Sequence, residues 1–442
     1  MDNTIDKTVY EAWIAKKIGW TGKELTTKLL MEYQLSMLNK VINRAYEHSF
    51  FYRRHLKDYG KYPLTSLADL ERFSFTTPQD LQTAGLKMVC VNQGEISHVV
   101  TLESSGTTGE PKRLYFTSQD QELTVDFFTQ SMSMLIRPDE QVYILLPANR
   151  PGGVGDLLYQ ALKRLNAKPV KYGLISSLPE MLENLINQPV SCLVGIPVQI
   201  LALARYYEHR GEKRKIPLNK ILLCTDYVSQ AISREIERIW DCEVFDYYGM
   251  TEAGLGGGME CGARCGYHLH EADLFFEIVD PMTGRPVMEG QPGEVVISTL
   301  TRQGMPLLRY RTGDLSRFIP GRCRCGTILR RLEKVRARKS GLISIGNGGC
   351  YITMADLDEA LFSIPDVVNF TADVTRQADR SDLKISLYTL SRNMDESEIK
   401  QTLSSIPAVG SALAAGNFDI ITECLVVTDK ISANSGKRKI NL

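Results

Sequence analysis

The stretch KILLCTDYVSQAISREIERIWDCEVFDYYG, residues 220–249, contains the pattern that decides the fold. Residues 220–224 are mostly apolar and predict a buried strand, and 230–240 carry apolar residues at helical spacing. A second apolar run begins at Val244. Two buried strands joined through a helix predict a parallel pair, because parallel strands need a crossover of this kind.

The same alternation is found earlier in the chain. Apolar runs at 142–146 and 192–196 predict further buried strands, and 156–166 predicts a helix. We therefore predict an α/β fold with a mostly parallel sheet. Residues 28–48 predict another helix, because one apolar stripe recurs at three- and four-residue spacing. The stripe consists of Met31, Leu35, Leu38, Ile42 and Ala45.

The later part of the chain changes character. Residues 273–280 and 293–300 predict strands joined by a Gly/Pro-rich turn, so the region of about 255–335 is predicted to be β-rich. A basic and then glycine-rich stretch at 334–350 marks a boundary. We predict a large domain at 1–336 and a small, mobile α+β domain at 337–442.

Within the small domain, the pattern predicts alternating strands and helices. The predicted helices are 354–364, with Thr353 and Asp356 as a capping pair, and 395–406. The predicted strands are 367–374, 383–390 and 424–428.

Composition excludes some classes of protein. The 442 residues include 52 Lys+Arg and 52 Asp+Glu, so charge gives no reason to expect nucleic acid or an anionic membrane as a partner. No apolar run is long enough to span a bilayer, and the charged N-terminus does not resemble a secretory signal. A cytoplasmic protein is the expectation.

A polar loop carries the first chemical motif. The stretch TLESSGTTGEPKRLYFT (101–117) places four hydroxyls and two glycines in a row before Lys112. Such a run suits a loop whose N–H groups and hydroxyls wrap an anion, or a flexible linker. It is not a Walker A loop, because Gly106 and Gly109 are too close together.

Two acidic residues follow strand-like segments. Glu252, in YGMTE, is placed to hold Mg²⁺ beside a polyphosphate, or to interact with a helix N-terminus. Asp314, in YRTGD, is placed to accept hydrogen bonds from ribose hydroxyls, or to form a plain turn. Arg309 and Arg311 are candidates to pair with Asp314 or with phosphate. Lys437, in the terminal NSGKRKINL, is either a solvated charge or a mobile lysine that reaches a phosphate.

Taken in this order, the four motifs resemble those of the adenylate-forming superfamily. Within it the chain resembles the phenylacetate–CoA ligase family over nearly its whole length, including VINRAYEHSFFYRRHLKDYG and TLTRQGMPLLRYRTGDLSRF. The resemblance implies an ATP-dependent acid–CoA ligase that works through an acyl-adenylate, on an aryl or arylacetic acid. It also implies ATP, Mg²⁺ and CoA as cofactors and a homodimer as the assembly.

The resemblance also implies a role for each motif residue. Lys437, Glu252 and Thr251 would be catalytic, with Glu252 also holding Mg²⁺. The ATP-binding set would be Ser104, Ser105, Gly106, Thr107, Thr108, Gly109, Lys112, Tyr248, Asp314 and Arg338. Candidates for contact with the acid are Tyr143, Tyr227 and Gly249.

Three segments depart from the family's usual pattern. Leu102 and Glu103 stand where a histidine usually precedes the two serines. Cys224-Thr225-Asp226-Tyr227 replaces the usual Gly-Ala-Glu-Pro, and 337–341 lacks the hinge aspartate. These departures keep open a second function, in which the acyl group passes to a carrier-protein thiol or another acceptor. A third reading is a non-catalytic nucleotide-binding protein.

Cysteines cluster in the β-rich region. Cys261, Cys265 and His268 precede Cys323 and Cys325, which gives five candidate ligands for a tetrahedral zinc. Some members of the resembled family carry a Cys…His…Cys-x-Cys set in these places. The resemblance therefore implies that Cys261, His268, Cys323 and Cys325 hold a structural Zn²⁺, with Cys265 as a spare and His270 as a weaker candidate. The alternative is a set of unrelated thiols.

Overall fold

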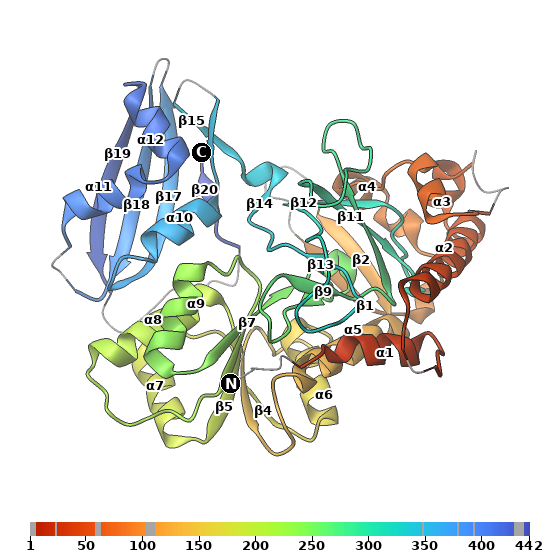
Figure 1. Cartoon of the computed structure of the whole chain (residues 1–442), viewed down its shortest axis with the longest axis horizontal. Helices are drawn as coiled ribbons and strands as arrows, with labels where there is room; N and C mark the ends of the chain where they lie inside the picture. The colour runs from red at the N-terminus through yellow and green to blue at the C-terminus, as the bar shows by residue number, and fades with distance from the viewer. Residues whose placement is uncertain are drawn as a thin grey trace. The chain divides into compact units, whose positions relative to one another are not determined.

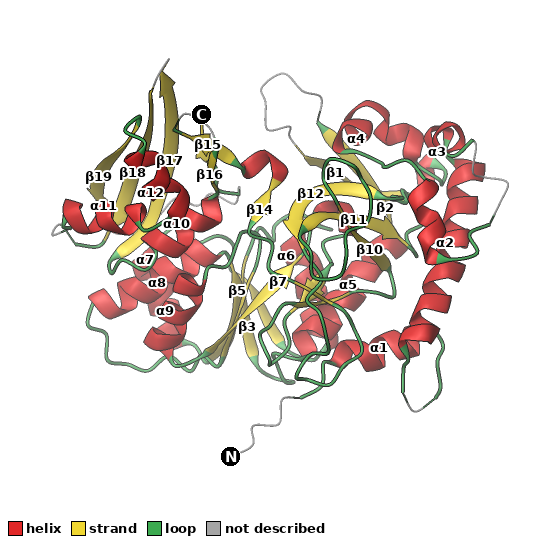
Figure 2. Ribbon diagram, turned by 45° about the horizontal axis from the view of Figure 1, so that its top comes forward, coloured by secondary structure: helices red, strands yellow, loops and turns green. Residues whose placement is uncertain are grey.

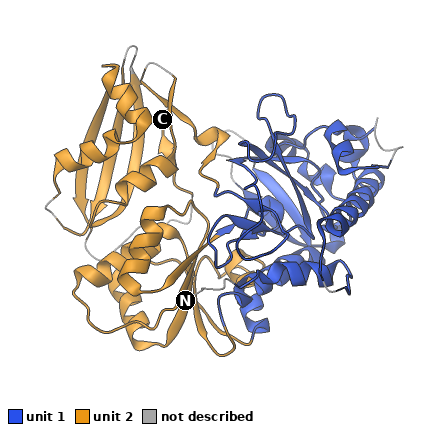
Figure 3. Ribbon diagram, in the orientation of Figure 1, with its two compact units in different colours: residues 1–136, 160–165, 247–334 blue, residues 137–159, 166–246, 335–442 orange. Residues whose placement is uncertain are grey.

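The computed structural model describes residues 6–22, 24–57, 63–102, 111–346, 349–377, 380–391, 394–427 and 437–442 (Figure 1). Contacts divide the chain into two compact units, which Figure 3 colours separately. Unit 1 contains residues 1–136, 160–165 and 247–334, and unit 2 contains residues 137–159, 166–246 and 335–442.

The parallel sheet predicted from residues 220–249 forms the centre of unit 2. Its strands pair in the order β4, β3, β5, β6, β7, and every one of these pairings is parallel. Their bounds are β3 (Gln141–Leu145), β4 (Lys168–Lys171), β5 (Val190–Gly195), β6 (Lys220–Leu223) and β7 (Glu243–Tyr248). The prediction of an α/β fold with a mostly parallel sheet is confirmed.

Helices follow the strands of this sheet, and those after β4, β5 and β6 share its core (Figure 2). They are α6 (Val154–Arg164), α7 (Leu178–Asn187), α8 (Pro197–His209) and α9 (Gln230–Trp240). Helix α9 has the predicted bounds and buries Ile232, Ile236 and Trp240, which lie four residues apart. It ends at Asp241, whose φ of 50° reverses the chain into β7.

Residues 335–442 of unit 2 contain a second sheet, in the order β19, β18, β17, β20. The bounds are β14 (Ala337–Arg338), β15 (Ile343–Ile345), β16 (Cys350–Ile352), α10 (Met354–Leu361), β17 (Val367–Gln377), β18 (Arg380–Thr389), α11 (Glu396–Ser404), α12 (Pro407–Ala414), β19 (Phe418–Val426) and β20 (Ile440–Asn441). Thr353 and Asp356 form the predicted capping box of α10. The strand predicted at 424–428 is shifted, because β19 begins at Phe418 and pairs with β18 throughout.

A buried arginine joins α8 to this second sheet within unit 2. Arg205 is 4% exposed and donates hydrogen bonds to the carbonyls of Phe362 (2.7 Å), Ile364 (3.0 Å) and Val367. Glu235 lies 3.4 Å away and supplies the opposite charge. Because buried carbonyls need donors, one side chain satisfies the backbone where α10 leads into β17.

Unit 1 contains the β-rich region together with the N-terminal helices. Strands β10 and β11 confirm the strands predicted at 273–280 and 293–300, and together with β12 they form an antiparallel sheet. The bounds are α1 (Val9–Lys17), α2 (Thr27–His48), α3 (Phe50–His55), α4 (Pro78–Ala84), β1 (Ile96–Leu102), β2 (Lys112–Thr117), α5 (Ser118–Ser133), β8 (Gly258–Met259), β9 (Tyr267–Leu269), β10 (Leu274–Val279), β11 (Gly293–Thr299), β12 (Tyr310–Ser316) and β13 (Arg331–Leu332).

Helix α2 confirms the helix predicted at 28–48 but corrects its buried stripe. Leu38, Ile42 and Ala45 are buried, whereas Met31 is 48% exposed and Leu30 is buried instead. The core-facing side is therefore rotated slightly at the start of the helix, where Met31 lines a surface pocket. Within the described residues, no helix is long and apolar enough to cross a membrane.

We predict that Arg205→Met lowers the free energy of unfolding by about 2–3 kcal/mol, because three buried carbonyls lose their donor. Urea unfolding followed by circular dichroism measures the change. Arg210→Met is the matched control, because Arg210 is exposed at the end of the same helix. Equal midpoints for the two variants would contradict the role given to Arg205.

Candidate functional site

Glu252 is the centre of the candidate site in unit 1. It lies four residues after the end of β7, in a short 3₁₀ turn (Thr251–Ala253), and its burial leaves 5% of the residue exposed. Its Oε1 accepts hydrogen bonds from Lys112 Nζ at 2.8 Å and from the Tyr310 hydroxyl at 3.0 Å. Three distant segments of sequence thus meet at one carboxylate oxygen.

These contacts hold the carboxylate in its ionised form. Burial by itself would raise the pKa of Glu252, but the charge and hydrogen bond of Lys112, with help from Tyr310, outweigh it. The pKa of Glu252 therefore lies below its ordinary value. The site therefore contains a buried carboxylate that stays ionised beside a lysine.

The turn that carries Glu252 is also held through its backbone. Buried Arg302 donates from Nη1 to the Glu252 carbonyl at 2.7 Å, and its guanidinium stacks 4.9 Å from the Phe116 ring centre. Gly254 has a φ of 73°, and a Cβ there would lie 2.9 Å from Arg302 Nη2. Backbone position, and not only side-chain pairing, thus sets where the carboxylate points.

The second acidic residue lies on β12. Asp314 is 4% exposed and accepts a hydrogen bond of 2.9 Å from the Tyr248 hydroxyl. Tyr248 stacks on Tyr267, with ring centres 5.7 Å apart. Because β12 carries both Tyr310 and Asp314, one strand supports both carboxylates of the site.

The two arginines proposed as partners of Asp314 pair elsewhere. Arg309 Nη2 lies 2.8 Å from Glu277, and Arg311 Nε lies 2.9 Å from Glu294. Arg309 also donates to the backbone and has a φ of 46°, so it is a structural residue. This pairing is a correction to the sequence-based expectation.

The other predicted site residues fall into three groups. Ser104, Ser105, Gly106, Thr107, Thr108 and Gly109 lie outside the described residues. Gly249 lies in unit 1, where a Cβ would come within 2.3 Å of the Leu255 carbonyl oxygen. Those in unit 2 are Tyr143, which is buried in β3, Tyr227, which is half-buried, Arg338 in β14, and Lys437, which is exposed just before β20.

Two supporting residues were missed by sequence reasoning. Tyr310 lies within the quoted motif RYRTGD, and Arg302 lies within TLTRQG. Position within a motif was the available signal for Tyr310. For Arg302 the sequence offers no comparable signal, since its contact is with a backbone carbonyl.

The four predicted zinc ligands lie together, and all four are buried. The ligand atoms of Cys261, His268, Cys323 and Cys325 all lie within 4.8 Å of one another. The Cys261 and Cys323 sulfurs are 3.7 Å apart, and Cys325 Sγ is 3.5 Å from His268 Nε2. Zn–S bonds of about 2.3 Å and Zn–N bonds of about 2.0 Å give tetrahedral edges of about 3.8 and 3.5 Å.

Two distances within the cluster thus match the edges of a tetrahedral zinc site. The pKa of Cys325 is lowered, because the Cys261 thiol and the His268 ring hydrogen-bond to its sulfur. The two weaker candidates lie outside the cluster. Cys265 is exposed and contacts Arg331, and His270 pairs with Asp273 at 2.7 Å.

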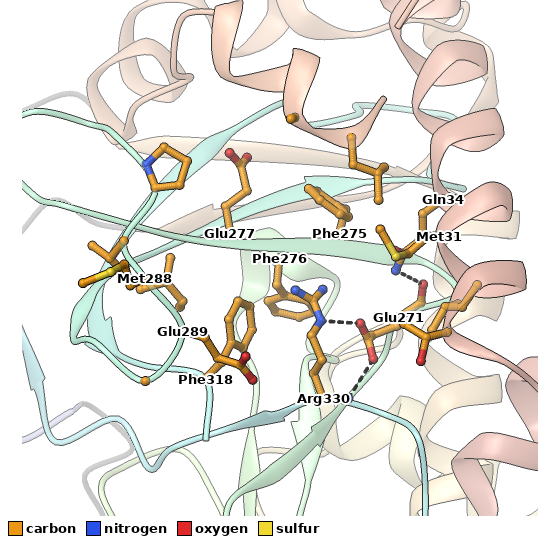
Figure 4. A pocket seen from close by; sticks show the side chains of 18 of the residues that line it. Met31, Gln34, Glu271, Phe275, Phe276, Glu277, Met288, Glu289, Phe318 and Arg330 are labelled. Atoms are coloured by element: carbon orange, nitrogen blue, oxygen red, sulfur yellow. Dashed lines mark hydrogen bonds and ion pairs between the residues drawn. The ribbon is translucent and has the colours of Figure 1, made fainter. Parts of the chain in front are cut away.

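A separate pocket in unit 1 has a volume of about 330 Å³ (Figure 4). Its lining includes Phe275, Phe276 and Phe318, and Arg330 donates to Glu271 at its side. Among the described residues, the lining includes none of those predicted to bind ATP, the acid or a metal. The pocket therefore shares no lining residue with the contacts described around Glu252.

Comparison with known proteins shows what this chain is similar to. The AMP-binding enzyme family matches residues 97–301, which include Lys112, Tyr248 and Glu252. Phenylacetate–coenzyme A ligase of Thermus thermophilus is 29% identical over 376 residues, 82% of each chain. The enzyme of the same name from Escherichia coli is 28% identical over 331 residues, 72% of each chain.

Solved structures agree on the fold. 2-Hydroxyisobutyryl-CoA ligase in its postadenylation state, in complex with 2-HIB-AMP, matches with a TM-score of 0.77 and 22% identity. The match covers 93% of this chain and 89% of that one. The resemblance predicted from the motifs is confirmed: the chain is similar to phenylacetate–coenzyme A ligases, and residues 97–301 match the AMP-binding enzyme family.

We predict that Lys112→Met lowers the free energy of unfolding at pH 7.5 by about 3 kcal/mol, because it leaves the buried Glu252 charge unpaired. The deficit shrinks as the pH falls below 4.5, the ordinary pKa of a glutamate, and through the lowered pKa that Glu252 has in the folded protein. The stability difference falls with pH because the pKa of Glu252 is lowered, so the wild-type pair stabilises the fold only while Glu252 is ionised.

Urea unfolding at several pH values measures this dependence. The control is Lys87→Met, because Lys87 is exposed in the same unit. A deficit in Lys112→Met that does not change with pH would contradict the ion-pair explanation.

Proposed function

We propose that the protein is an ATP-dependent carboxylic acid–CoA ligase that works through an acyl-adenylate and takes an aryl or arylacetic acid. The observation that carries the proposal is the ionised, buried Glu252, with Lys112 and Tyr310 on one oxygen, in a chain related to phenylacetate–coenzyme A ligases. Asp314, on the same strand as Tyr310, and Tyr248, the last residue of β7, complete the site.

The first half-reaction joins the acid to AMP. A carboxylate oxygen of the acid attacks the α-phosphorus of ATP, and the bond to pyrophosphate breaks. Mg²⁺, when bound, offsets the negative charge of the phosphates, and Glu252 and Thr251 would hold it. Lys437 neutralises charge between the acid and the α-phosphate, Lys112 and the loop 104–109 hold the other phosphates, and Asp314 orients the ribose.

The second half-reaction transfers the acyl group to CoA. The CoA sulfur attacks the acyl carbon, and AMP leaves with the oxygen that came from the acid. Lys437 is not needed in this step, so residues 337–442 act as a mobile domain that swings it away, with Arg338 at the junction. The boundary at 336/337 belongs to this proposal.

Zinc is proposed as a structural ion. Cys261, His268, Cys323 and Cys325 occupy all four positions, so no position is open for substrate. The ion would tie β8 and β9 to the loop between β12 and β13, and β12 carries two of the site's residues.

We also propose a cytoplasmic homodimer.

Transfer to a carrier-protein thiol is kept as a second candidate. The supporting observation is the altered segment 224–227, where Thr225 has a φ of 82° and Tyr227 hydrogen-bonds to Glu359. The acceptor step would differ between the two candidates, while adenylation would be common to both.

The test is ATP–pyrophosphate exchange with Mg²⁺ and no CoA, against a panel of aryl, arylacetic and aliphatic acids. Exchange with aryl or arylacetic acids is expected, followed by thioester formation when CoA is added. Exchange that yields thioester only with a carrier protein would favour the second candidate. ATP binding without exchange for any acid would overturn the proposal.

We predict that Lys437→Ala reduces exchange at least about 100-fold, because charge stabilisation of the adenylation step is lost. Thioester formation from a supplied acyl-adenylate and CoA should remain. The matched control is Lys439→Ala, because Lys439 is also exposed and lies two residues away. Equal loss in the two variants would show that Lys437 has no special role.

We predict that Cys261→Ser removes bound zinc and lowers the thermal unfolding midpoint, whereas Cys265→Ser keeps about one zinc per chain. Inductively coupled plasma mass spectrometry of the purified protein measures the metal. Wild-type protein that contains no zinc when purified from zinc-supplemented cells would count against the site.

A further inference from the structure

The residue that follows Lys437 is held by two carboxylates. Arg438 donates from Nη2 to Asp358 of α10, and its Nε lies 3.4 Å from Asp226 Oδ2. Asp358 is completely buried, and the side chains of Arg438 and Asp226 are each 15% exposed. The guanidinium also lies 5.0 Å from the ring centres of Phe362 and Phe370.

This arrangement fixes the backbone beside Lys437. On the far side of Arg438, β20 pairs with β17 through Ile440 and Asn441, and Asn441 hydrogen-bonds to Asp373 at 2.9 Å. Lys437 itself remains exposed. A long, flexible side chain is thereby attached to a backbone that has little freedom, which lowers the entropy lost when the lysine is positioned.

The two carboxylates belong to different parts of unit 2. Asp358 and Arg438 both lie within 337–442, so they stay together wherever that part of the chain moves. Asp226 follows β6 at the carboxyl end of the parallel sheet, the edge where ligands of α/β proteins bind. The Asp226–Arg438 pair therefore forms only when Lys437 is held near that edge.

A second contact lies beside the first. Glu359 accepts hydrogen bonds from the Tyr227 hydroxyl (2.8 Å) and from the backbone N–H of Gln230 (3.0 Å), at the first residue of α9. A carboxylate at a helix N-terminus is stabilised by the helix dipole. Asp226 and Tyr227, which stand in the segment that departs from the family pattern, thus both contact residues of the small domain.

The Asp226–Arg438 pair is built so that it can open. Arg438 Nη1 and Asp358 Oδ2 are buried without a hydrogen-bond partner among the described residues, so the cluster is not fully satisfied. Asp226 makes the longer of the two contacts to Arg438, at 3.4 Å, and both side chains of this pair are 15% exposed, so water can replace the contact when it opens. A contact that must break in every catalytic cycle needs this property.

We propose that Asp226 is a positioning residue for adenylation: it pairs with Arg438 to hold Lys437 at the carboxyl end of β6, and releases it for thioester formation. The proposal rests on the proposed function. It gives the unusual segment 224–227 a role in a chain whose junction, 337–341, has no hinge aspartate.

The experiment compares Asp226→Asn with Asp226→Glu and with Asp241→Asn. Asparagine keeps the shape but removes the charge, and glutamate keeps the charge. Asp241 is the matched control, because it is an exposed aspartate of the same unit in a left-handed conformation that asparagine tolerates. Each variant is assayed for exchange with the best acid, and for thioester formation from the preformed acyl-adenylate and CoA.

Asp226→Asn is expected to lower the maximal exchange rate about tenfold, with an unchanged KM for ATP and an unchanged thioester step. Asp226→Glu should recover most of the rate, and Asp241→Asn should match wild type. A loss shared equally by both half-reactions, or no loss at all, would overturn the proposal.

Hydrogen exchange of residues 437–442 supplies a readout that does not depend on activity. Faster exchange in Asp226→Asn than in wild type supports the contact, and equal exchange overturns it. If the wild-type protein is inactive in both half-reactions but exchanges more slowly than Asp226→Asn, the proposed function is overturned while the contact stands.

Discussion

The candidate site depends on one buried carboxylate that has to remain charged. Glu252 has little exposure, and desolvation alone would favour its neutral form. Lys112 and Tyr310 reverse that preference from two other strands, and Arg302 fixes the turn through the backbone. The antiparallel β-rich part of unit 1 helps to keep Glu252 ionised, because it brings Tyr310 of β12 next to the turn that follows β7. The Cys/His cluster lies between strands of the same region and would stiffen it.

Much of the fold was predictable because burial leaves a periodic trace in the sequence. Helix α9 was predicted with its observed bounds, since its buried residues recur every four positions. The capping box of α10 was likewise visible in Thr353 and Asp356. The start of β19 was missed, because this strand alternates buried and exposed residues only over its first part. Pairing with β18, and not a run of apolar residues, defines its length.

The candidate site was predictable where chemistry is concentrated in motifs. Glu252, Lys112 and Asp314 were identified this way, and so were the four clustered Cys and His residues. Contacts made by backbone atoms, or between segments far apart in sequence, leave no such trace. Arg302 donates to a carbonyl, and Arg438 is held by carboxylates 80 and 212 residues away. Arg309 and Arg311 show the converse, because proximity in sequence suggested Asp314 as a partner while the folded chain gives each a glutamate.

The central claim is that the chain joins a carboxylate to the α-phosphate of ATP, and isotope transfer tests it most directly. The acid that supports exchange is labelled with ¹⁸O in its carboxylate and turned over with ATP and CoA, and the products are examined by mass spectrometry. The account predicts that one labelled oxygen from each acid molecule appears in AMP. Labelled inorganic phosphate formed together with ADP would contradict it, because the acid would then have been activated as an acyl phosphate.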